Sequence, residues 1–200
     1  MIEALPAVDS TLFFMVNGHH LPVLDWLFLA VTQLGNGWVI GPVLIFIVIR
    51  KVPKQKVVTT VLCGVVALSF SGIVNSRIKR VVGRQRPYVH FAHHADSISK
   101  AATGPDVRLL GPSYRNRSFP SGHTNTAFSA ATLLAFLFGG WWYAAFAAAI
   151  AVAYSRMYLG VHYPTDVAAG ALFGVLLTLS VMVVCRQLKL LTPHRRKNAQ

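Results

Sequence analysis

Charged residues are scarce in this chain, and acidic residues are the scarcest. Only 12% of its 200 residues are charged, about half the proportion typical of soluble domains, whereas 54% are hydrophobic. This composition excludes an ordinary soluble domain and indicates a membrane protein. The 19 Lys and Arg outnumber the 6 Asp and Glu, so nucleic acid, anionic lipid and an anionic substrate all remain open as partners.

Cysteine is also nearly absent, and the features of a cleavable secretory signal are lacking. Cys63 and Cys185 each lie within or at the end of an apolar stretch, which predicts packing as small hydrophobic side chains and no disulfide framework. Residues 1–10 have neither the basic region nor the compact apolar segment of such a signal. Targeting is therefore expected to depend on the first hydrophobic helix.

Long apolar segments are abundant. A bilayer core of about 30 Å needs about 20 helical residues, and four segments fit: residues 57–78, 122–138, 141–157 and 165–185. A fifth, 38–49, is short, and segment 21–34 contains Asp25 and stops at Gly35-Asn36-Gly37, which favours an interfacial or re-entrant helix. We therefore predict an all-α fold, a polytopic transmembrane helical bundle with five membrane helices, or six if segment 21–34 also spans.

The predicted bundle is one integral membrane domain over residues 1–200. It divides into interfacial amino-terminal helices (1–35), two spans (36–78), an outer loop (79–120), three further spans (121–186) and a basic tail (187–200). Basic residues flank the first and last spans, which by the positive-inside rule places them in the cytoplasm. They are Arg50, Lys51, Lys54, Lys56, Arg186, Lys189, Arg195, Arg196 and Lys197. The expected location is the cytoplasmic (inner) membrane, with the outer loop facing the periplasm or cell exterior.

The outer loop and the helix end before it break this charge rule. They carry Arg77, Lys79, Arg80, Arg84, Arg86, Lys100, Arg108, Arg115 and Arg117. An anionic substrate would explain cations on this face, and the alternative is an inverted topology. The equally basic opposite face argues against inversion.

A first candidate site runs from Ser155 to Asp166. A Pro-Thr pair predicts a helix start with Thr165 as N-cap, which puts Asp166 in the first turn and His162 just before it. A carboxylate there can hold one imidazole nitrogen and aim the other at an electrophile. The alternative is a carboxylate that only complements the helix dipole, beside an interfacial histidine.

Two further segments have features of an anion site. Pro120-Ser121-Gly122-His123 predicts a helix capped by Ser121, with first-turn N–H groups that an anion can approach over Gly122; the alternative is an ordinary cap beside an exposed histidine. Lys79 and Arg86 are two helical turns apart, so both can lie on one side of a helix that Pro87 stops. Their alternative role is snorkelling at the membrane boundary.

Together, Lys79-x6-Arg86-Pro87, Pro120-Ser121-Gly122-His123 and Ser155-Arg156-x5-His162-x3-Asp166 resemble the three-part signature of the type 2 phosphatidic acid phosphatase (PAP2) superfamily. Every signature position is present, and the resemblance covers about residues 57–185. It implies a PAP2/haloperoxidase-like core and a metal-independent lipid phosphatase.

The resemblance also implies a role for each signature residue. His162 would be the nucleophile that forms a phosphohistidine, Asp166 would orient it, and His123 would act first as acid and then as base. The substrate phosphate would be bound by Lys79, Arg86, Ser121, Gly122 and Arg156. From their position in the loop alone, Arg108, Arg115 and Arg117 are predicted to bind a second phosphate or another part of the head group.

No metal or other cofactor is expected. Asp166 is the only carboxylate near the cluster, which suits neither Mg²⁺ nor Zn²⁺. His90, His93 and His94 are interpreted as chance histidines of a polar loop rather than metal ligands.

The expected partners are the lipid bilayer and a membrane lipid phosphate. Candidate substrates are undecaprenyl diphosphate, slightly favoured by an outward site, phosphatidylglycerophosphate, phosphatidic acid and the phosphates of lipid A. Nucleic acid is disfavoured because the cations are split between two membrane faces. The sequence has no signal for an oligomeric state.

Two other function classes explain part of the sequence. A vanadium haloperoxidase-like enzyme would use matching residues, but such enzymes are generally soluble. A non-catalytic membrane protein that binds anionic lipid would explain the cations but not two histidines and an aspartate at these spacings.

Overall fold

The structure is a computed structural model that describes residues 4–91, 107–114, 117–140 and 142–191. Every regular element in these ranges is helical, which confirms the all-α prediction. The elements are α1 (Ala4–Asn17), α2 (Pro22–Val31), the 3-10 helix η1 (Thr32–Gly35), α3 (Gly37–Lys51), α4 (Lys54–Val82), α6 (Gly122–Phe138), α7 (Trp142–Tyr158) and α8 (Pro164–Gln187). A short helical turn covers residues 87–91.

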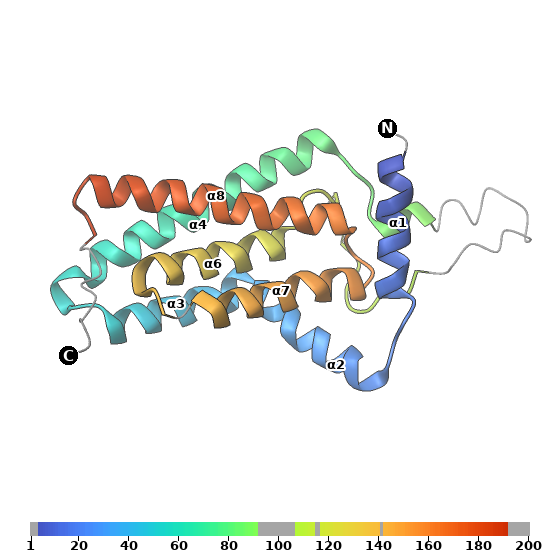
Figure 1. Cartoon of the computed structure of the whole chain (residues 1–200), viewed down its shortest axis with the longest axis horizontal. Helices are drawn as coiled ribbons and strands as arrows, with labels where there is room; N and C mark the ends of the chain where they lie inside the picture. Colours follow the sequence, from blue (N-terminus) through green and yellow to red (C-terminus); the bar gives the residue numbers. More distant parts are fainter. Residues whose placement is uncertain (1–3, 92–106, 115–116, 141, 192–200) are drawn as a thin grey trace, which may run out of the picture.

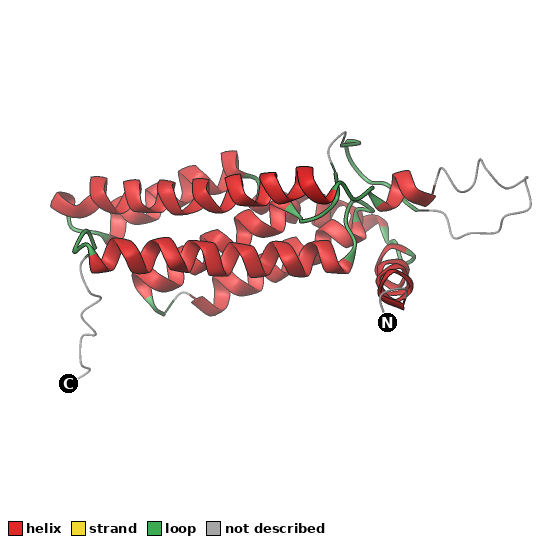
Figure 2. Cartoon of the chain, turned by 90° about the horizontal axis from the view of Figure 1, so that it is seen from above, coloured by secondary structure: helices red, strands yellow, loops and turns green. Residues whose placement is uncertain are grey.

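The long helices form an elongated bundle (Figure 1). Helices α4, α6, α7 and α8 alternate in direction, and α6 packs against α4, α7 and α8. Helix α1 crosses one end of the bundle and is seen end-on in Figure 2. The segments after α4, before α6 and between α7 and α8 all lie at this end, which brings the three signature motifs together as predicted.

Two helical stretches are long and apolar enough to cross a membrane: Lys54–Phe91, which contains α4, and α8. The pair formed by Pro22–Gly35 and α3, bent by 63° at the predicted break, would make a third. Helices α6 and α7 have 17 residues each, or about 25 Å. The structure thus gives a helical membrane protein with two or three candidate spans, and five or six spans remains a prediction.

Small residues bring α8 close to α6. A Cβ added at Gly170 would lie 2.5 Å from the Ser121 carbonyl oxygen, and one at Gly174 would lie 2.6 Å from the Asn125 carbonyl oxygen. Such close approach is typical of helix pairs in membranes. It fixes the start of α6 beside the start of α8. Toward the other end of the bundle, Cys63 and Cys185 are free thiols buried in a hydrophobic cluster, as predicted.

Two helix ends differ from the prediction. Helix α4 ends at Val82 because Gly83 adopts a left-handed conformation (φ 64°), so Pro87 begins the short turn over residues 87–91 instead of stopping a helix. Lys79 and Arg86 therefore do not share a helix face. The N-cap of α8 is Tyr163 rather than Thr165, while Asp166 lies in the first turn as predicted.

Candidate active site

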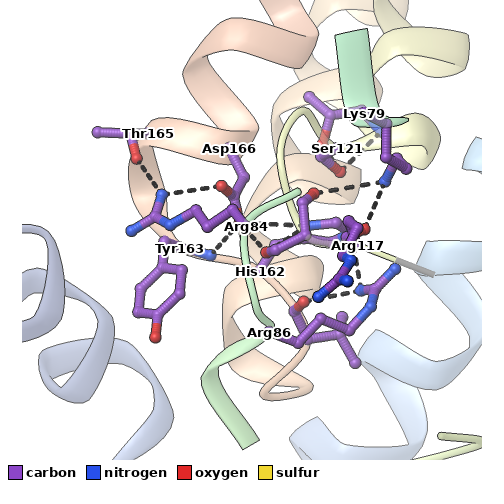
Figure 3. A network of polar contacts seen from close by, with 12 residues as sticks. Lys79, Arg84, Arg86, Arg117, Ser121, His162, Tyr163, Thr165 and Asp166 are labelled. Atoms are coloured by element: carbon purple, nitrogen blue, oxygen red, sulfur yellow. Dashed lines mark hydrogen bonds and ion pairs between the residues drawn. The ribbon is translucent and has the colours of Figure 1, made fainter. Parts of the chain in front are cut away.

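His162 and Asp166 form the centre of a buried polar cluster (Figure 3). The His162 side chain is 2% exposed and Asp166 is fully buried. Nδ1 of His162 lies 3.4 Å from Oδ2 of Asp166, which also accepts a hydrogen bond from the Tyr163 N–H at 2.9 Å and one from the Ser118 hydroxyl. These contacts fix the carboxylate beside the ring.

The other ring nitrogen faces Arg86. Nη1 of Arg86 lies 3.2 Å from Nε2 of His162 and donates to the Val161 carbonyl at 2.8 Å. A guanidinium has no acceptor, so this contact assigns the lone pair to Nε2 and the proton to Nδ1, which faces Asp166. This is the tautomer that a nucleophilic Nε2 requires.

The surroundings of His162 favour its neutral form. Burial, followed by the positive charges of Arg86, Arg156 and Lys79, holds the pKa of His162 well below its ordinary value of 6.5. A neutral imidazole keeps its lone pair at neutral pH and below. The ring is therefore in the reactive protonation state without needing a separate base.

Arg156 is a deeply buried cation at the end of α7. It is 2% exposed, and Nη1 donates to the Thr32 hydroxyl at 2.7 Å. Within the described part of the chain it pairs with no carboxylate, and its buried Nε has no hydrogen-bond partner. The ring of Tyr114 lies 5.4 Å from this guanidinium and 4.8 Å from that of Arg86. Because a buried charge is costly without a counterion, this arrangement favours an anionic ligand.

Lys79 lies in the last turn of α4, on the other side of the loop before α6. Its Nζ donates to the Arg117 carbonyl at 3.0 Å and to the Ser118 carbonyl at 3.4 Å. The charges of Lys79, Arg86 and Arg156 act on both His162 and His123. The cations predicted to bind phosphate therefore converge on one cluster.

Ser121 caps α6 as predicted. Its Oγ accepts from the Thr124 N–H at 3.5 Å, and the side chain is fully buried. However, its own N–H donates to the Asp166 carbonyl at 2.9 Å. Ser121 thus joins α6 to α8, and any N–H groups that bind an anion here must be those of Gly122 and His123.

His123 is half-buried in the first turn of α6. A Cβ added at Gly35 would lie 2.8 Å from both Cβ and the carbonyl oxygen of His123. Only glycine therefore lets η1 pack against this turn. The break between α2 and α3 therefore packs directly against the turn that carries His123.

Three residues of the cluster were not predicted from the sequence. Arg84 donates to Asp166 Oδ1 at 2.9 Å and to Asp9 Oδ2 at 2.5 Å, and Ser118 donates to Asp166 Oδ2. The sequence offered one signal: Arg84 is a further cation within the Lys79-x6-Arg86 spacing. Asp9 and Ser118 gave none, because their positions depend on how distant segments fold over the site.

The three arginines predicted to bind a head group occupy different places. Arg108 pairs with Asp25 through Nη2 and Oδ2 at 2.8 Å, and its side chain is about half exposed. Arg117 is exposed beside Lys79. Arg115 lies outside the described residues, as do His93 and His94 of the loop interpreted as free of metal. Among the described residues, no group of three or more His, Cys, Asp or Glu side chains could hold a metal ion.

The family is decided by comparison with known proteins. Residues 60–189 match the model of the PAP2 superfamily. The chain belongs to the PAP2 superfamily. A lipid A 4'-phosphatase of Bacteroides thetaiotaomicron is 33% identical over 181 residues, which cover 87% of this chain and 75% of that relative. An undecaprenyl-diphosphatase of Sulfolobus acidocaldarius is 29% identical over 164 residues, 82% of this chain and 71% of the relative.

Solved structures agree with this membership. The crystal structure of Aquifex aeolicus LpxE superposes with a TM-score of 0.67 at 32% identity, covering 87% of this chain and 94% of that one. The first transmembrane PAP2 type phosphatidylglycerolphosphate phosphatase from Bacillus subtilis superposes with a TM-score of 0.71 over 92% of this chain and 87% of that one; at 22% identity it supports the fold alone. The predicted resemblance is confirmed, and the chain is a PAP2-type membrane lipid phosphatase.

Proposed function

We propose that this PAP2 phosphatase hydrolyses a phosphate ester or anhydride of a membrane lipid through a phosphohistidine on His162. The observation that carries the proposal is the pair of contacts on its ring, Arg86 at Nε2 and Asp166 at Nδ1. In the first step Nε2 attacks phosphorus, a P–N bond forms, and the bond from phosphorus to the lipid oxygen breaks. Asp166 stabilises the positive charge that develops on the ring.

The buried cations supply the charge stabilisation. Lys79, Arg86 and Arg156, with the N–H groups of Gly122 and His123, would hold the three non-bridging oxygens of the phosphoryl group. Positioning and charge stabilisation account for most of the catalysis in phosphoryl transfer. Binding would draw Arg86 from Nε2 onto a phosphate oxygen, which frees the lone pair for attack.

His123 would move the protons. A phosphate dianion beside its ring favours the imidazolium, which can protonate the leaving lipid oxygen. The resulting neutral imidazole then takes a proton from water, which attacks phosphorus as the P–N bond breaks. Free phosphate leaves, and His162 returns to its starting form.

We propose a metal-independent reaction because the donor set does not suit a metal. Both oxygens of Asp166 are already hydrogen-bonded, to Arg84 and to Ser118 and the Tyr163 N–H. Hard cations such as Mg²⁺ need several oxygen ligands. Activity is expected to persist in a chelator such as EDTA, and loss of activity that added Mg²⁺ or Zn²⁺ restores would reject this part of the proposal.

The lipid head group would enter the site from the membrane boundary. We propose five spans with the site on the periplasmic or outer face, because the basic residues beside the α3–α4 turn and the end of α8 lie at the opposite end of the bundle (Figure 1). The names of the matched relatives make lipid A phosphate and undecaprenyl diphosphate the first candidates, ahead of phosphatidylglycerophosphate and phosphatidic acid. Phosphate release by the purified protein across these four lipids identifies the preferred one.

Trapping the phosphoenzyme tests the mechanism. With a substrate whose leaving oxygen needs no protonation, such as a nitrophenyl phosphate, His123→Ala should still form the intermediate but hydrolyse it slowly. We expect a burst of about one nitrophenol per enzyme and an acid-labile, base-stable phosphate on His162. The same experiment on His162→Asn should give neither, and a phosphoenzyme that survives this substitution would rule out His162 as nucleophile.

A further inference from the structure

The two oxygens of Asp166 have separate partners. Oδ2 faces the site through the ring of His162, the Ser118 hydroxyl and the Tyr163 N–H. Oδ1 faces away and accepts from Nη1 of Arg84 at 2.9 Å. A carboxylate held at both oxygens cannot rotate, so the direction in which Oδ2 meets the imidazole depends on Arg84.

Arg84 is itself fixed from three sides. Its Nη1 also donates to the Thr165 hydroxyl at 2.7 Å, and its Nη2 donates to Asp9 Oδ2 at 2.5 Å. Its guanidinium carbon lies 3.9 Å from the centre of the Tyr163 ring. The Arg84 side chain is 26% exposed, whereas that of Asp9 is 3% exposed.

Asp9 connects this arrangement to α1. Its Oδ1 accepts from the Thr165 N–H at 2.9 Å, and its Oδ2 accepts from the Thr165 hydroxyl at 2.6 Å. Asp9 thus binds the first turn of α8 directly and also through Arg84. The helix that crosses the end of the bundle is therefore hydrogen-bonded to the turn that carries Asp166.

We propose that Arg84 and Asp9 are positioning residues: Arg84 fixes the Asp166 carboxylate so that it holds His162 for attack, and Asp9 fixes Arg84. The inference rests on the proposed function of His162 as nucleophile. Helix α1 lies outside the family match over residues 60–189, and this proposal gives the helix an indirect part in the reaction.

A direct role for Arg84 in binding phosphate fits the geometry less well. Both of its terminal nitrogens are engaged by Asp9, Asp166 and Thr165. In Figure 3 its guanidinium lies on the Thr165 side of Asp166, whereas Lys79 and Arg86 lie on the other side of His162. Arg84 can reach the reacting phosphorus only through the carboxylate.

The chemistry of the side chain provides the test. A guanidinium offers nitrogens in a rigid fork that can bind two carboxylates at once, whereas a lysine is a single point of charge. Arg84→Lys keeps the charge but loses one of the two contacts. At metal sites, removing a partner that orients a ligating histidine typically costs about 10- to 100-fold, and we use this range for the partner of Asp166. We expect kcat of Arg84→Lys to fall by about this factor while KM changes less than about twofold.

The matched control is Arg80→Lys, which makes the same exchange at an exposed position in the last turn of α4. Its kcat and KM should both stay within about twofold of the original values. A rise in KM at constant kcat for Arg84→Lys would make Arg84 a substrate ligand and overturn the proposal. Unchanged values of kcat and KM for Arg84→Lys would also overturn the proposal. Thermal unfolding of each variant shows whether a loss of kcat exceeds the loss of folded protein.

Asp9→Asn tests the second half of the link without changing the shape of the side chain. We expect a smaller fall in kcat, again at nearly constant KM, and no further fall when it is added to Arg84→Lys, because both act through the same carboxylate. Fully additive losses, or none from Asp9→Asn, would remove Asp9 from the proposal. If the phosphohistidine forms in the unaltered protein but Arg84→Lys keeps its kcat, this inference fails alone. If no phosphohistidine forms, the proposed function fails with it.

Discussion

Two buried polar clusters lie at the same end of this protein, and they are built from the same kinds of residue. In one, the carboxylate of Asp25 accepts from Tyr158 at 2.7 Å, lies 3.0 Å from the ring of His20, and pairs with Arg108 at 2.8 Å. In the other, Asp166 meets His162 and Arg84, and the further cation Arg156 pairs with no carboxylate in the described part of the chain.

The difference between the clusters lies in how their charge is balanced. At Asp25 each charged group has an opposite partner, so the cluster ties α2 to the end of α7 and the loop at Arg108. Around His162 the cations outnumber the nearby carboxylates, which leaves positive charge to meet a phosphate. Residue types alone would not have separated a structural cluster from a catalytic one.

Replacing the histidine of each cluster with alanine, in separate variants, is the strongest test of this comparison. His162→Ala removes the proposed nucleophile and should lower phosphate release by about 10⁴- to 10⁶-fold. His20→Ala removes an equally buried ring, 5% exposed, from the other cluster and should lower the midpoint of thermal unfolding while activity per folded molecule stays nearly unchanged. Activity assays beside thermal melts of both variants decide the point. Similar losses of activity would mean that the clusters are not functionally distinct.

The arginines give the next largest effect. Arg156→Lys removes the planar fork from a buried site and should lower kcat/KM by about 100-fold, near the lower end for loss of a donor to a transition-state oxygen. Arg108→Lys can keep a single ion pair with Asp25 and should change kcat/KM less than about threefold. Steady-state kinetics on one lipid phosphate compares the two. Equal sensitivity at both positions would contradict the idea that only the His162 cluster binds the phosphoryl group that reacts.

The buried neutral imidazole should also affect stability in acid. The pKa of His162 is well below 6.5 in the folded protein and rises to its ordinary value on unfolding, so below about pH 6.5 the unfolded state binds one more proton. Stability should therefore fall as pH is lowered through this range. Thermal melts in detergent from pH 7.5 to 5, with His162→Gln as control, measure it. The control should show a shallower dependence, and an identical slope would mean that other groups cause it.

The smallest expected effect concerns the arginines predicted to bind the head group. Replacing Arg108, Arg115 and Arg117 together with Gln should change the ratio of KM values between a lipid monophosphate and a lipid diphosphate by severalfold, with little change in kcat. The ratio is the measurement, because it cancels a general loss of folded protein. If selectivity among lipid phosphates stays the same, the head-group assignment should be dropped.

Much of this site could be predicted from the sequence. Helices that alternate in direction must bring the segments after α4, before α6 and before α8 to one end, and short local patterns mark Ser121 as a cap and Asp166 as a first-turn residue. The same alternation of the helices places Lys79, in the last turn of α4, at this end. These features depend only on neighbouring residues and on membrane thickness.

The remaining features depend on contacts between distant segments. Nothing local indicates that Asp9 meets Arg84, that Thr32 meets Arg156, or that Gly35 packs against His123. The end of α4 is a different case, because Gly83 is a local stop signal, whereas the predicted stop was Pro87. The prediction failed there because a proline after a helix can equally well begin the next one.

The hydrogen bond between Asp9 and Thr165 joins residues 156 positions apart in the chain. A nascent chain can therefore form this bond only after Thr165 has left the ribosome, long after α1 has emerged. Shorter nascent chains contain α1 but not the turn that carries Asp166. The contact between α1 and α8 is thus among the last that the growing chain can form.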